Sequence, residues 1–266
     1  MRYLILSGNT GGGHNAAAAA IREEFLRRGD VCDVEDGLQY LSEITSEIIS
    51  RGHSYVYNNL PQLFGKAYVF EENHSPQLIY DSMSLGAEKF YRTVADKGYD
   101  AIICVHIFAG MLANEAKKRY GWRIPLYLVA TDYTCSPGTT TIDADTFFIP
   151  HPALVPEFVA CGVPREKLVA SGIPIKRDFY DLPEKAEARK SLGLPPQDKI
   201  VLLFCGSIGC GRMNRIAPEI IDKIPADTTL VIICGHNRRT YKKLIEKANA
   251  HTVVIGYTDQ IAQYMA

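Results

Sequence analysis

The feature of this chain that most constrains its fold is the alternation of short apolar runs with helix-length segments from one end to the other. Most runs are continuous stretches of Val, Ile, Leu and Phe, which is typical of parallel strands that helices cover on both faces. The runs are residues 3–7, 31–35, 101–105, 126–130, 146–149, 168–170, 200–204, 229–233 and 252–255. Apolar residues at helical spacing occupy 16–27, 107–119, 183–192 and 239–248. The pattern predicts an α/β protein with doubly wound, Rossmann-like sheets.

A strand, a glycine-rich loop and a helix follow one another twice, near residue 8 and again near residue 206. Between the two units, Gly172-Ile173-Pro174-Ile175 is typical of a linker. We therefore predict two Rossmann-like domains, residues 1–175 and 176–266. Residues 38–97 contain no clear strand and are far longer than an ordinary crossover, so they predict a helical insertion in the first domain.

The second predicted domain has three strand runs, fewer than a stable open sheet usually contains. We expect this domain to be incomplete, with residues 200–204 and 229–233 partly uncovered.

Composition excludes several classes of protein. With 29 Lys and Arg against 30 Asp and Glu, the net charge is −1, so we expect no nucleic-acid partner. No apolar run is long enough to cross a bilayer, and the chain starts directly with a strand-like run. The seven cysteines include no CxxC pair, which is typical of reduced thiols in the cytoplasm.

The first glycine loop fits two phosphate-binding patterns only in part. Gly8 and Gly13 have the spacing of a nucleoside-triphosphatase loop, but His14-Asn15 stands where Lys and Ser or Thr belong, and this excludes that class. Gly11-x-Gly13-x-x-Ala16 satisfies a dinucleotide fingerprint, and acids stand near the end of the second strand run at Asp33, Glu35 and Asp36. An NAD-type oxidoreductase therefore remains open as an interpretation.

His14 is the residue of this loop whose side chain could take part in acid–base chemistry. It stands at the start of a helix, where the positive end of the dipole disfavours the imidazolium form and favours a neutral ring that accepts a proton from an alcohol. The alternative is that His14 only packs the loop. His106 and Asp132 each follow another strand run of the same predicted sheet, so all three could face one crevice. None has a short metal-ligand spacing, and we expect no metal.

The second glycine loop follows residues 200–204 and precedes a helix that starts near Asn214. Its backbone N–H groups could bind a diphosphate; the alternative is a tight turn that needs glycine for its geometry. The candidate residues are Gly206, Ser207, Gly209 and Gly211.

Several motifs together resemble one known family, the monogalactosyldiacylglycerol synthases and bacterial processive diacylglycerol glucosyltransferases. The opening motif has Asn9 where the family usually has Asp, Ile107 replaces a Pro, and Thr139 replaces a Trp. The segments that carry the resemblance are Leu6-Ser7-Gly8-Asn9-Thr10-Gly11-Gly12-Gly13-His14, His106-Ile107-Phe108, Thr131-Asp132-Tyr133, Gly162-Val163-Pro164, Gly172-Ile173-Pro174, Cys234-Gly235-His236-Asn237 and Gly256-Tyr257.

The resemblance implies a two-Rossmann glycosyltransferase architecture, GT-B. It implies transfer of glucose or galactose from UDP-glucose or UDP-galactose to diacylglycerol, with inversion, without a metal or other cofactor, on the cytoplasmic face of the membrane as a peripheral protein. By this resemblance His14 and Asp132 are the candidate catalytic residues. Candidate acceptor-binding residues are Gly11, Gly12, Gly13 and His106, and the second loop faces the donor phosphates.

The family also has a Lys-Pro-Gly-Gly segment and a following Glu helix in its donor domain, and no such segment follows Gly256 here. We therefore expect the 266 residues by themselves to bind UDP-sugar poorly or not at all and to transfer no hexose. Two alternatives to a diacylglycerol glycosyltransferase stay open beside the oxidoreductase: a non-catalytic lipid- or partner-binding module, and a lipid-linked N-acetylglucosaminyltransferase. Membrane association is expected through the aromatic-rich residues 38–97.

Overall fold

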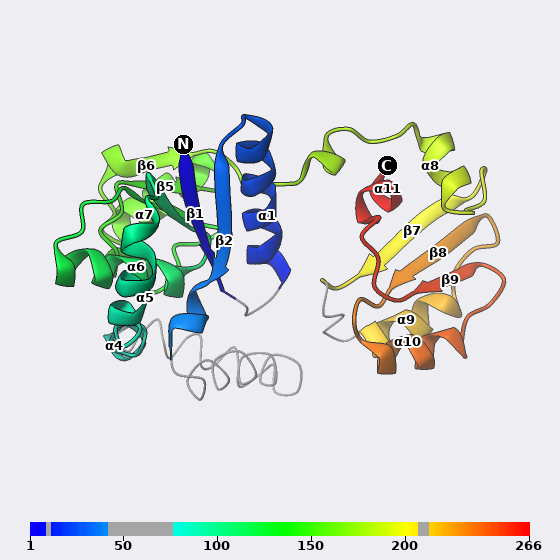
Figure 1. Ribbon diagram of the computed structural model, residues 1–266. Helices are drawn as coiled ribbons and strands as arrows, with labels where there is room; N and C mark the ends of the chain where they lie inside the picture. The colour runs from blue at the N-terminus through cyan, green and yellow to red at the C-terminus, as the bar shows by residue number, and fades with distance from the viewer. Residues whose placement is uncertain (9–11, 42–76, 207–212) are drawn as a thin grey trace. The chain divides into compact units, whose positions relative to one another are not determined.

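The computed structural model describes residues 1–8, 12–41, 77–206 and 213–266. The chain divides into two compact units, Met1–Lys176 and Arg177–Ala266, and each is built around its own parallel sheet (Figure 1). The boundary between the units lies one residue after the expected one. Much of the expected insertion lies outside the described residues, and its described part contains the helices α4 (Gln77–Ser84) and α5 (Ala87–Val94).

Every apolar run that was predicted to be a strand forms one. The first unit has a six-stranded parallel sheet in the order β2-β1-β3-β4-β5-β6. Its strands are β1 (Arg2–Ser7), β2 (Val31–Asp36), β3 (Ala101–Cys104), β4 (Leu126–Val129), β5 (Thr146–Ile149) and β6 (Leu168–Ala170).

Helices cover both faces of this sheet because successive strand side chains point to opposite faces. Leu4 and Leu6 of β1 are fully buried in the larger core, with α4, α5 and α6 (Ile107–Tyr120). Ile5 points the other way and packs in a smaller core with Ala18 of α1 (Gly12–Arg27). A short helix, α7 (Val155–Ala160), follows β5.

The helix α1 begins at Gly12, four residues before the predicted start. The first N–H groups of any helix lack partners within it, so glycine costs less in the first turn than in the interior. Beyond that turn, the small side chains of Ala17, Ala18 and Ala20 are buried and let the helix lie close to the sheet. This start brings His14 into the first turn of α1.

The second unit has a three-stranded parallel sheet in the order β7-β8-β9. One face packs against α9 and α10 through Leu230 and Ile232, and the opposite face carries Val231 and Ile233 together with Tyr264 of α11. The elements are α8 (Lys185–Ser191), β7 (Lys199–Phe204), α9 (Met213–Ile221), β8 (Thr228–Ile233), α10 (Arg238–Ile245), β9 (Thr252–Ile255) and α11 (Ile261–Met265).

The expectation of uncovered strands is right for one strand and wrong for the other. On β7, an edge strand, Val201 is 41% and Phe204 44% exposed. Every residue of β8 is buried, because β8 is the central strand and has packed side chains on both faces. Among the described residues, no helix combines the length and the apolar character that crossing a bilayer requires.

Candidate active site

The candidate site of the first unit lies where β1, β3 and β4 end. Leu6, Cys104 and Leu128 are register partners across these strands. Gly8 and His106 each come two residues after that row and therefore lie at the same level on neighbouring strands. Between β1 and β3 the strand order changes direction, and in open α/β sheets ligands bind at the carboxyl ends of the strands at such a switch point.

His106 and Gly8 lie so close that any side chain at position 8 would force the His106 ring to shift. A Cβ atom on Gly8 would lie 2.7 Å from Cδ2 and 2.8 Å from Cγ of His106. The His106 side chain cannot easily move away, because the residue is only 7% exposed. Gly8 is thus needed for this close approach rather than for an unusual backbone angle.

His14 is held at this edge by two contacts of its Nδ1 atom. That atom lies 2.8 Å from the carbonyl oxygen of Val105 and 2.9 Å from Oγ1 of Thr131. A carbonyl oxygen only accepts, so Nδ1 carries a proton and donates it. In the neutral ring the lone pair therefore lies on Nε2, which is the atom that can accept a proton from a substrate.

His106 has the opposite tautomer. The backbone N–H of Phe108 donates to its Nδ1 at 3.1 Å and caps the start of α6, so the ring proton of neutral His106 lies on Nε2. The ring centres of His14 and His106 are 4.5 Å apart with an interplanar angle of 63°. His14, which can accept a proton at Nε2, thus lies edge to face with His106, which carries a proton at Nε2.

The structure brings His14 and His106 together, as predicted, but gives Asp132 a different position. Asp132 is exposed, and its carboxylate accepts a hydrogen bond from Ser136 at 3.4 Å within its own loop. Its neighbour Thr131 is the residue that contacts His14. Sequence reasoning did not select Thr131 as a site residue, although its place directly after a strand of the sheet was an available signal.

A carboxylate of α7 anchors the loop that carries Asp132. Glu157 accepts hydrogen bonds from the hydroxyl of Thr134 at 2.6 Å and from the backbone N–H of Cys135 at 2.7 Å. These two donors hold the pKa of Glu157 below its ordinary value. The loop after β4 is therefore tied to a helix of the same unit.

Two of the three glycines predicted to bind the acceptor lie in the first turn of α1. Gly12 and Gly13 contribute N–H groups that have no partner within the helix, and a Cβ atom on Gly13 would meet nothing within 4 Å. Gly13 is exposed, so there is room for a ligand beside it. Gly11 lies outside the described residues.

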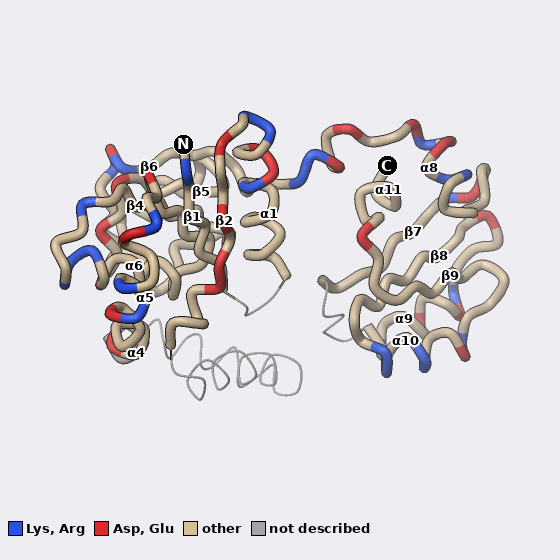
Figure 2. The backbone as a smooth tube through the Cα atoms, in the orientation of Figure 1, with Lys and Arg blue, Asp and Glu red and all other residues tan. Residues whose placement is uncertain are grey.

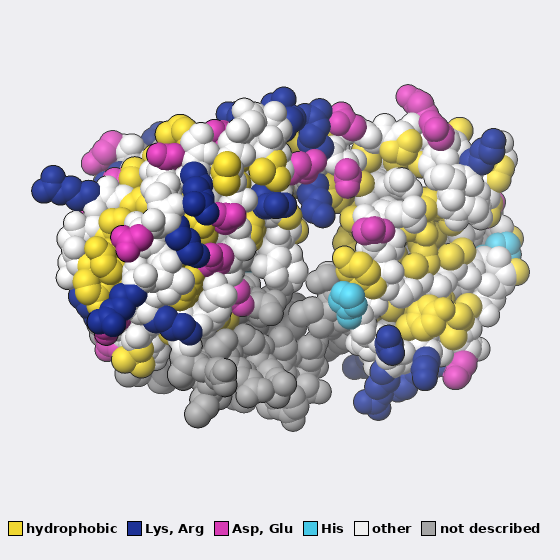
Figure 3. All heavy atoms as spheres, in the orientation of Figure 1, with side chains coloured by type: hydrophobic (Ala, Val, Ile, Leu, Met, Phe, Trp, Pro, Cys, Tyr) yellow, Lys and Arg dark blue, Asp and Glu magenta, His cyan; other side chains and the backbone are white. Residues whose placement is uncertain are grey.

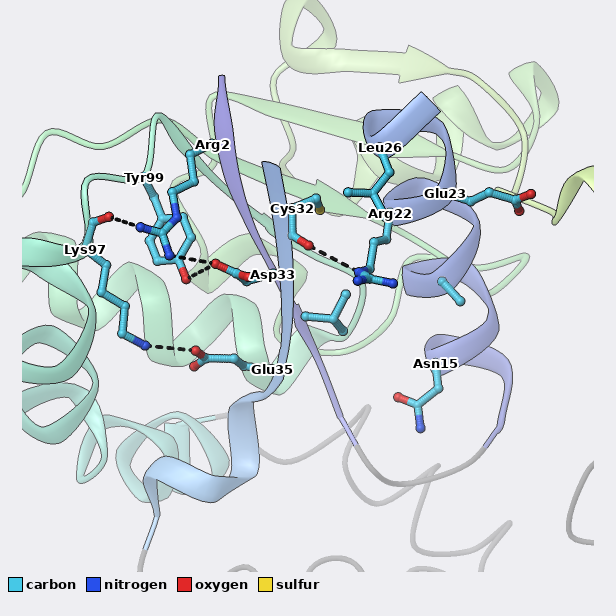
Figure 4. Close-up of a pocket in the computed structure, with 12 residues that line it drawn as sticks. Arg2, Asn15, Arg22, Glu23, Leu26, Cys32, Asp33, Glu35, Lys97 and Tyr99 are labelled. Atoms are coloured by element: carbon cyan, nitrogen blue, oxygen red, sulfur yellow. Dashed lines mark hydrogen bonds and ion pairs between the residues drawn. The ribbon is translucent and has the colours of Figure 1, made fainter. Parts of the chain in front are cut away.

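The acids that a dinucleotide would need, Asp33, Glu35 and Asp36, form hydrogen bonds and ion pairs with other groups of the first unit. Asp33 and Glu35 border a pocket of about 880 Å³ beside α1 and β2 (Figure 4). Asp33 accepts from Arg2 at 3.0 Å and from the Tyr99 hydroxyl at 2.7 Å, and these bonds lower the pKa of Asp33. Glu35 pairs with Lys97 at 3.0 Å and also accepts from a tyrosine hydroxyl. The pocket is lined by equal numbers of cations and carboxylates: Arg2, Arg22, Lys97, Glu23, Asp33 and Glu35.

Asp36 is engaged as well, because its side chain caps a short helix by accepting from the N–H of Leu38 at 2.9 Å. The three acids thus stabilise the edge of the sheet. This use argues against the oxidoreductase interpretation, in which a carboxylate at the end of β2 binds a ribose hydroxyl.

The second unit has its own glycine-lined edge at the ends of its strands. Phe204, Ile233 and Ile255 are register partners, so the residues that follow them come out at one edge of the sheet. Gly206 and Gly235 each lie two residues beyond this row, with φ of 59° and 57°. A side chain is strained at these angles, so both turns need glycine.

An aromatic pair stands at the same edge. The rings of His236 and Tyr257 stack with their centres 4.2 Å apart and 13° between their planes, and both residues are exposed. Of the predicted donor-phosphate residues, Gly206 lies at this edge. Ser207, Gly209 and Gly211 lie outside the described residues. Among the described residues, no group of three His, Cys, Asp or Glu could hold a metal ion.

Comparison with known proteins gives a family match and a set of relatives. The family described as monogalactosyldiacylglycerol (MGDG) synthase matches residues 14–175, which include His14, His106, Thr131 and Asp132. A processive diacylglycerol beta-glucosyltransferase from Staphylococcus carnosus is 23% identical over 278 residues, which span 100% of this chain and 68% of the relative. A protein of the same name from Bacillus cytotoxicus is 24% identical and spans 98% of this chain and 68% of its own length.

Solved structures with a similar fold include Anabaena HepE in complex with UDP-glucose, with a TM-score of 0.55, 15% identity, and coverage of 100% of this chain and 71% of that chain. Another is MurG from Acinetobacter baumannii, with a TM-score of 0.53, 13% identity, and coverage of 98% and 69%. At these identities the likeness shows the fold alone, which is the GT-B architecture that the sequence resemblance implied.

Proposed function

This chain belongs to the monogalactosyldiacylglycerol synthase family, and on that premise we propose that it transfers a hexose from a UDP-sugar to diacylglycerol. The observation that carries the proposal is the position of His14 at the switch point of the first sheet, with Nδ1 donating to Val105 and the Nε2 lone pair available. The first unit binds the lipid alcohol and the second binds the nucleotide sugar.

In the proposed reaction the hydroxyl oxygen of diacylglycerol attacks the anomeric carbon of the sugar. The new carbon–oxygen bond forms as the bond between that carbon and the diphosphate oxygen breaks, and UDP leaves with the electron pair. The hydroxyl proton passes to Nε2 of His14, which acts as general base. A single displacement inverts the configuration at the anomeric carbon.

Each neighbour of His14 has a role in this proposal. The Val105 carbonyl and the Thr131 hydroxyl fix the ring and its tautomer, and they stabilise the imidazolium that forms when Nε2 takes the proton. His106 presents an N–H rather than a lone pair at its Nε2, so it suits a hydrogen bond to substrate oxygen rather than proton abstraction. Asp132, exposed near this edge, is the second candidate for the base.

The proposed donor site is the strand-end edge of the second unit. The turn at Gly206 is exposed, and a Cβ atom there would meet nothing within 4 Å, so its backbone N–H groups are open to a diphosphate. The exposed pair His236 and Tyr257 offers an aromatic face on which a nucleotide base can stack. We place the reaction at the cytoplasmic face of the membrane, with the protein bound peripherally.

The test is incorporation of labelled hexose from UDP-glucose and from UDP-galactose into diacylglycerol in mixed micelles. The assay is run on the 266-residue chain and on the complete product of its reading frame. We expect the complete product to form a labelled hexosyl-diacylglycerol from at least one donor. A product that forms none from either donor, although it is folded and supplied with both substrates, contradicts the proposal.

A further inference from the structure

The second unit has a strongly cationic helix surface that the proposed reaction does not use. The solvent-exposed side of α10 and the turn after it contain five cations against one carboxylate, Glu246. We call this set the α10 cationic face, and it consists of Arg238, Arg239, Lys242, Lys243 and Lys247. Figure 2 shows blue Lys and Arg positions along the backbone at α10, and Figure 3 shows dark-blue side chains gathered at this end of the unit.

These cations lie on the side of the helix opposite the core. Thr240 and Leu244 are buried, whereas Arg238, Lys242 and Lys243 are exposed. At 100° per residue, the exposed cations of the helix occupy an arc opposite the buried pair. The face therefore projects into solvent.

None of the five cations forms an ion pair or a side-chain hydrogen bond with any described residue. In the first unit, by contrast, Arg2 pairs with Asp33 and Lys97 pairs with Glu35. The neighbouring helix α9 does not neutralise them, because Arg215 and Lys223 in and after it balance Glu219 and Asp222. The first turn of α10 contains two arginines and no acid, although a helix N-terminus favours negative charge. The charge on this face thus has no partner among the described residues of the unit.

The charge is local to this face. The second unit has 13 Lys and Arg against 10 Asp and Glu, so the excess of cations on α10 exceeds that of the whole unit. Exposed apolar side chains accompany it: Ile245 on α10 and Ile216 on the adjacent α9 are each 47% exposed.

We propose that the α10 cationic face is a docking surface for a bilayer that contains anionic lipids. Cations next to exposed aliphatic side chains match a lipid surface, where the cations meet headgroup phosphates and the aliphatic groups enter the boundary with the acyl chains. A nucleic acid would use the cations but not the isoleucines. The inference rests on the proposed function, because a peripheral enzyme must reach a lipid acceptor in the membrane.

The experiment measures binding of the 266-residue chain to sedimented vesicles and needs neither donor nor acceptor. Vesicles of phosphatidylcholine with 30 mol% phosphatidylglycerol are compared with phosphatidylcholine alone. Each cation near an anionic surface contributes about 1 kcal/mol, about five-fold in a partition coefficient, so Lys242→Gln/Lys243→Gln should lower binding to anionic vesicles about 25-fold. Salt at 0.5 M should abolish the binding.

The matched control is Lys185→Gln/Lys190→Gln on α8, which removes the same charge from two exposed lysines of the same unit. It should change binding less than two-fold. Ile245→Ser should lower vesicle binding about five-fold and leave any binding to a DNA duplex unchanged. Circular dichroism of every variant checks that each is folded.

Four results would overturn the proposal. The wild-type chain could fail to bind anionic vesicles. The α10 variant could bind as well as the wild type because another surface, such as residues 38–97, binds the membrane. The α8 control could lose as much binding as the α10 variant. A DNA duplex bound as tightly as the vesicles would also overturn it. Vesicle binding by this chain, together with no hexose transfer by the complete product of the reading frame, would instead count only against the proposed function.

Discussion

Gly8 and Gly13 stand on either side of the first glycine loop but differ in their surroundings. A Cβ atom on Gly8 would lie 2.7 Å from the buried His106 ring, whereas a Cβ atom on Gly13 would meet nothing within 4 Å. We expect Gly8→Ala to destabilise the first unit by about 1–3 kcal/mol, because the buried ring must shift. We expect the control Gly13→Ala to be neutral or stabilising by up to about 1 kcal/mol, because alanine favours a helix more than glycine does.

Urea unfolding followed by tryptophan fluorescence measures this difference in the first unit alone. The chain has one tryptophan, Trp122, which lies in that unit and contacts Phe90 and Tyr91. Equal stabilities of the two alanine variants would contradict the close approach of Gly8 and His106.

The assignment of His14 as general base is tested by His14→Ala in the complete product of the reading frame. We expect turnover to fall by about 10²-fold or more, with the stability of the first unit almost unchanged, since general base catalysis commonly contributes 10²–10⁴-fold. His251→Ala, at a histidine far along the chain in the second unit, serves as the control. Near-normal turnover of His14→Ala would make His14 structural and Asp132 the better candidate.

The convergence of His14 and His106 could be predicted from sequence because both follow strands of one sheet, and the carboxyl ends of parallel strands share an edge. The contact between Thr131 and His14 could not. Which of two adjacent residues, Thr131 or Asp132, points at the imidazole depends on the path of the loop after β4. That path is fixed by hydrogen bonds to Glu157, a residue of a later helix.

At the scale of elements, this bond between α7 and the loop after β4 gives a pH-dependent prediction. The hydrogen bonds lower the pKa of Glu157 in the folded state, so they add stability that is fully present above the unfolded value of about 4.3 and is lost as the pH falls through the folded pKa. We expect Glu157→Gln to lose about 1–2 kcal/mol of first-unit stability at pH 7. The difference from the wild type should shrink at pH 3.5.

Urea titrations at the two pH values, again followed by Trp122, provide the measurement. The control is Glu166→Gln, which removes an exposed carboxylate with no hydrogen-bond partner among the described residues. A difference between Glu157→Gln and the wild type that is the same at both pH values would show that the lost charge is not responsible.

The strands were predictable to within a residue or two because buried parallel strands are continuous apolar runs, as in residues 101–104. Helix limits were less predictable. The start of α1 at Gly12 contradicts the weak helix propensity of glycine, and burial of Ala17 and Ala18 outweighs it. The burial of β8 depends on its central place in the sheet, which the order of runs along the chain does not specify.

For the whole molecule, the family match and the engaged acids of β2 favour a UDP-sugar over a dinucleotide. The first unit supplies the histidines and the second supplies the glycine-lined edge with its aromatic pair. This division predicts that nucleotide binding is a property of the second unit. His236→Ala should therefore weaken UDP binding by several-fold, because the variant removes one of the two stacked rings that offer an aromatic face to the base.

Titration calorimetry with UDP compares His236→Ala with His251→Ala, another histidine of the second unit that is not part of the stack. If both variants bind UDP as the wild type does, the aromatic pair is not part of the donor site.

The central claim, that this Rossmann-like chain uses a uridine nucleotide, is tested most directly by saturation-transfer NMR of the 266-residue chain. UDP, ADP and NAD are present in equal amounts, so each serves as a control for the others. The method detects weak binding, and we predict that saturation reaches the uracil and ribose protons of UDP while the nicotinamide and adenine protons of NAD receive none. Saturation of NAD at or above the level of UDP would contradict the account.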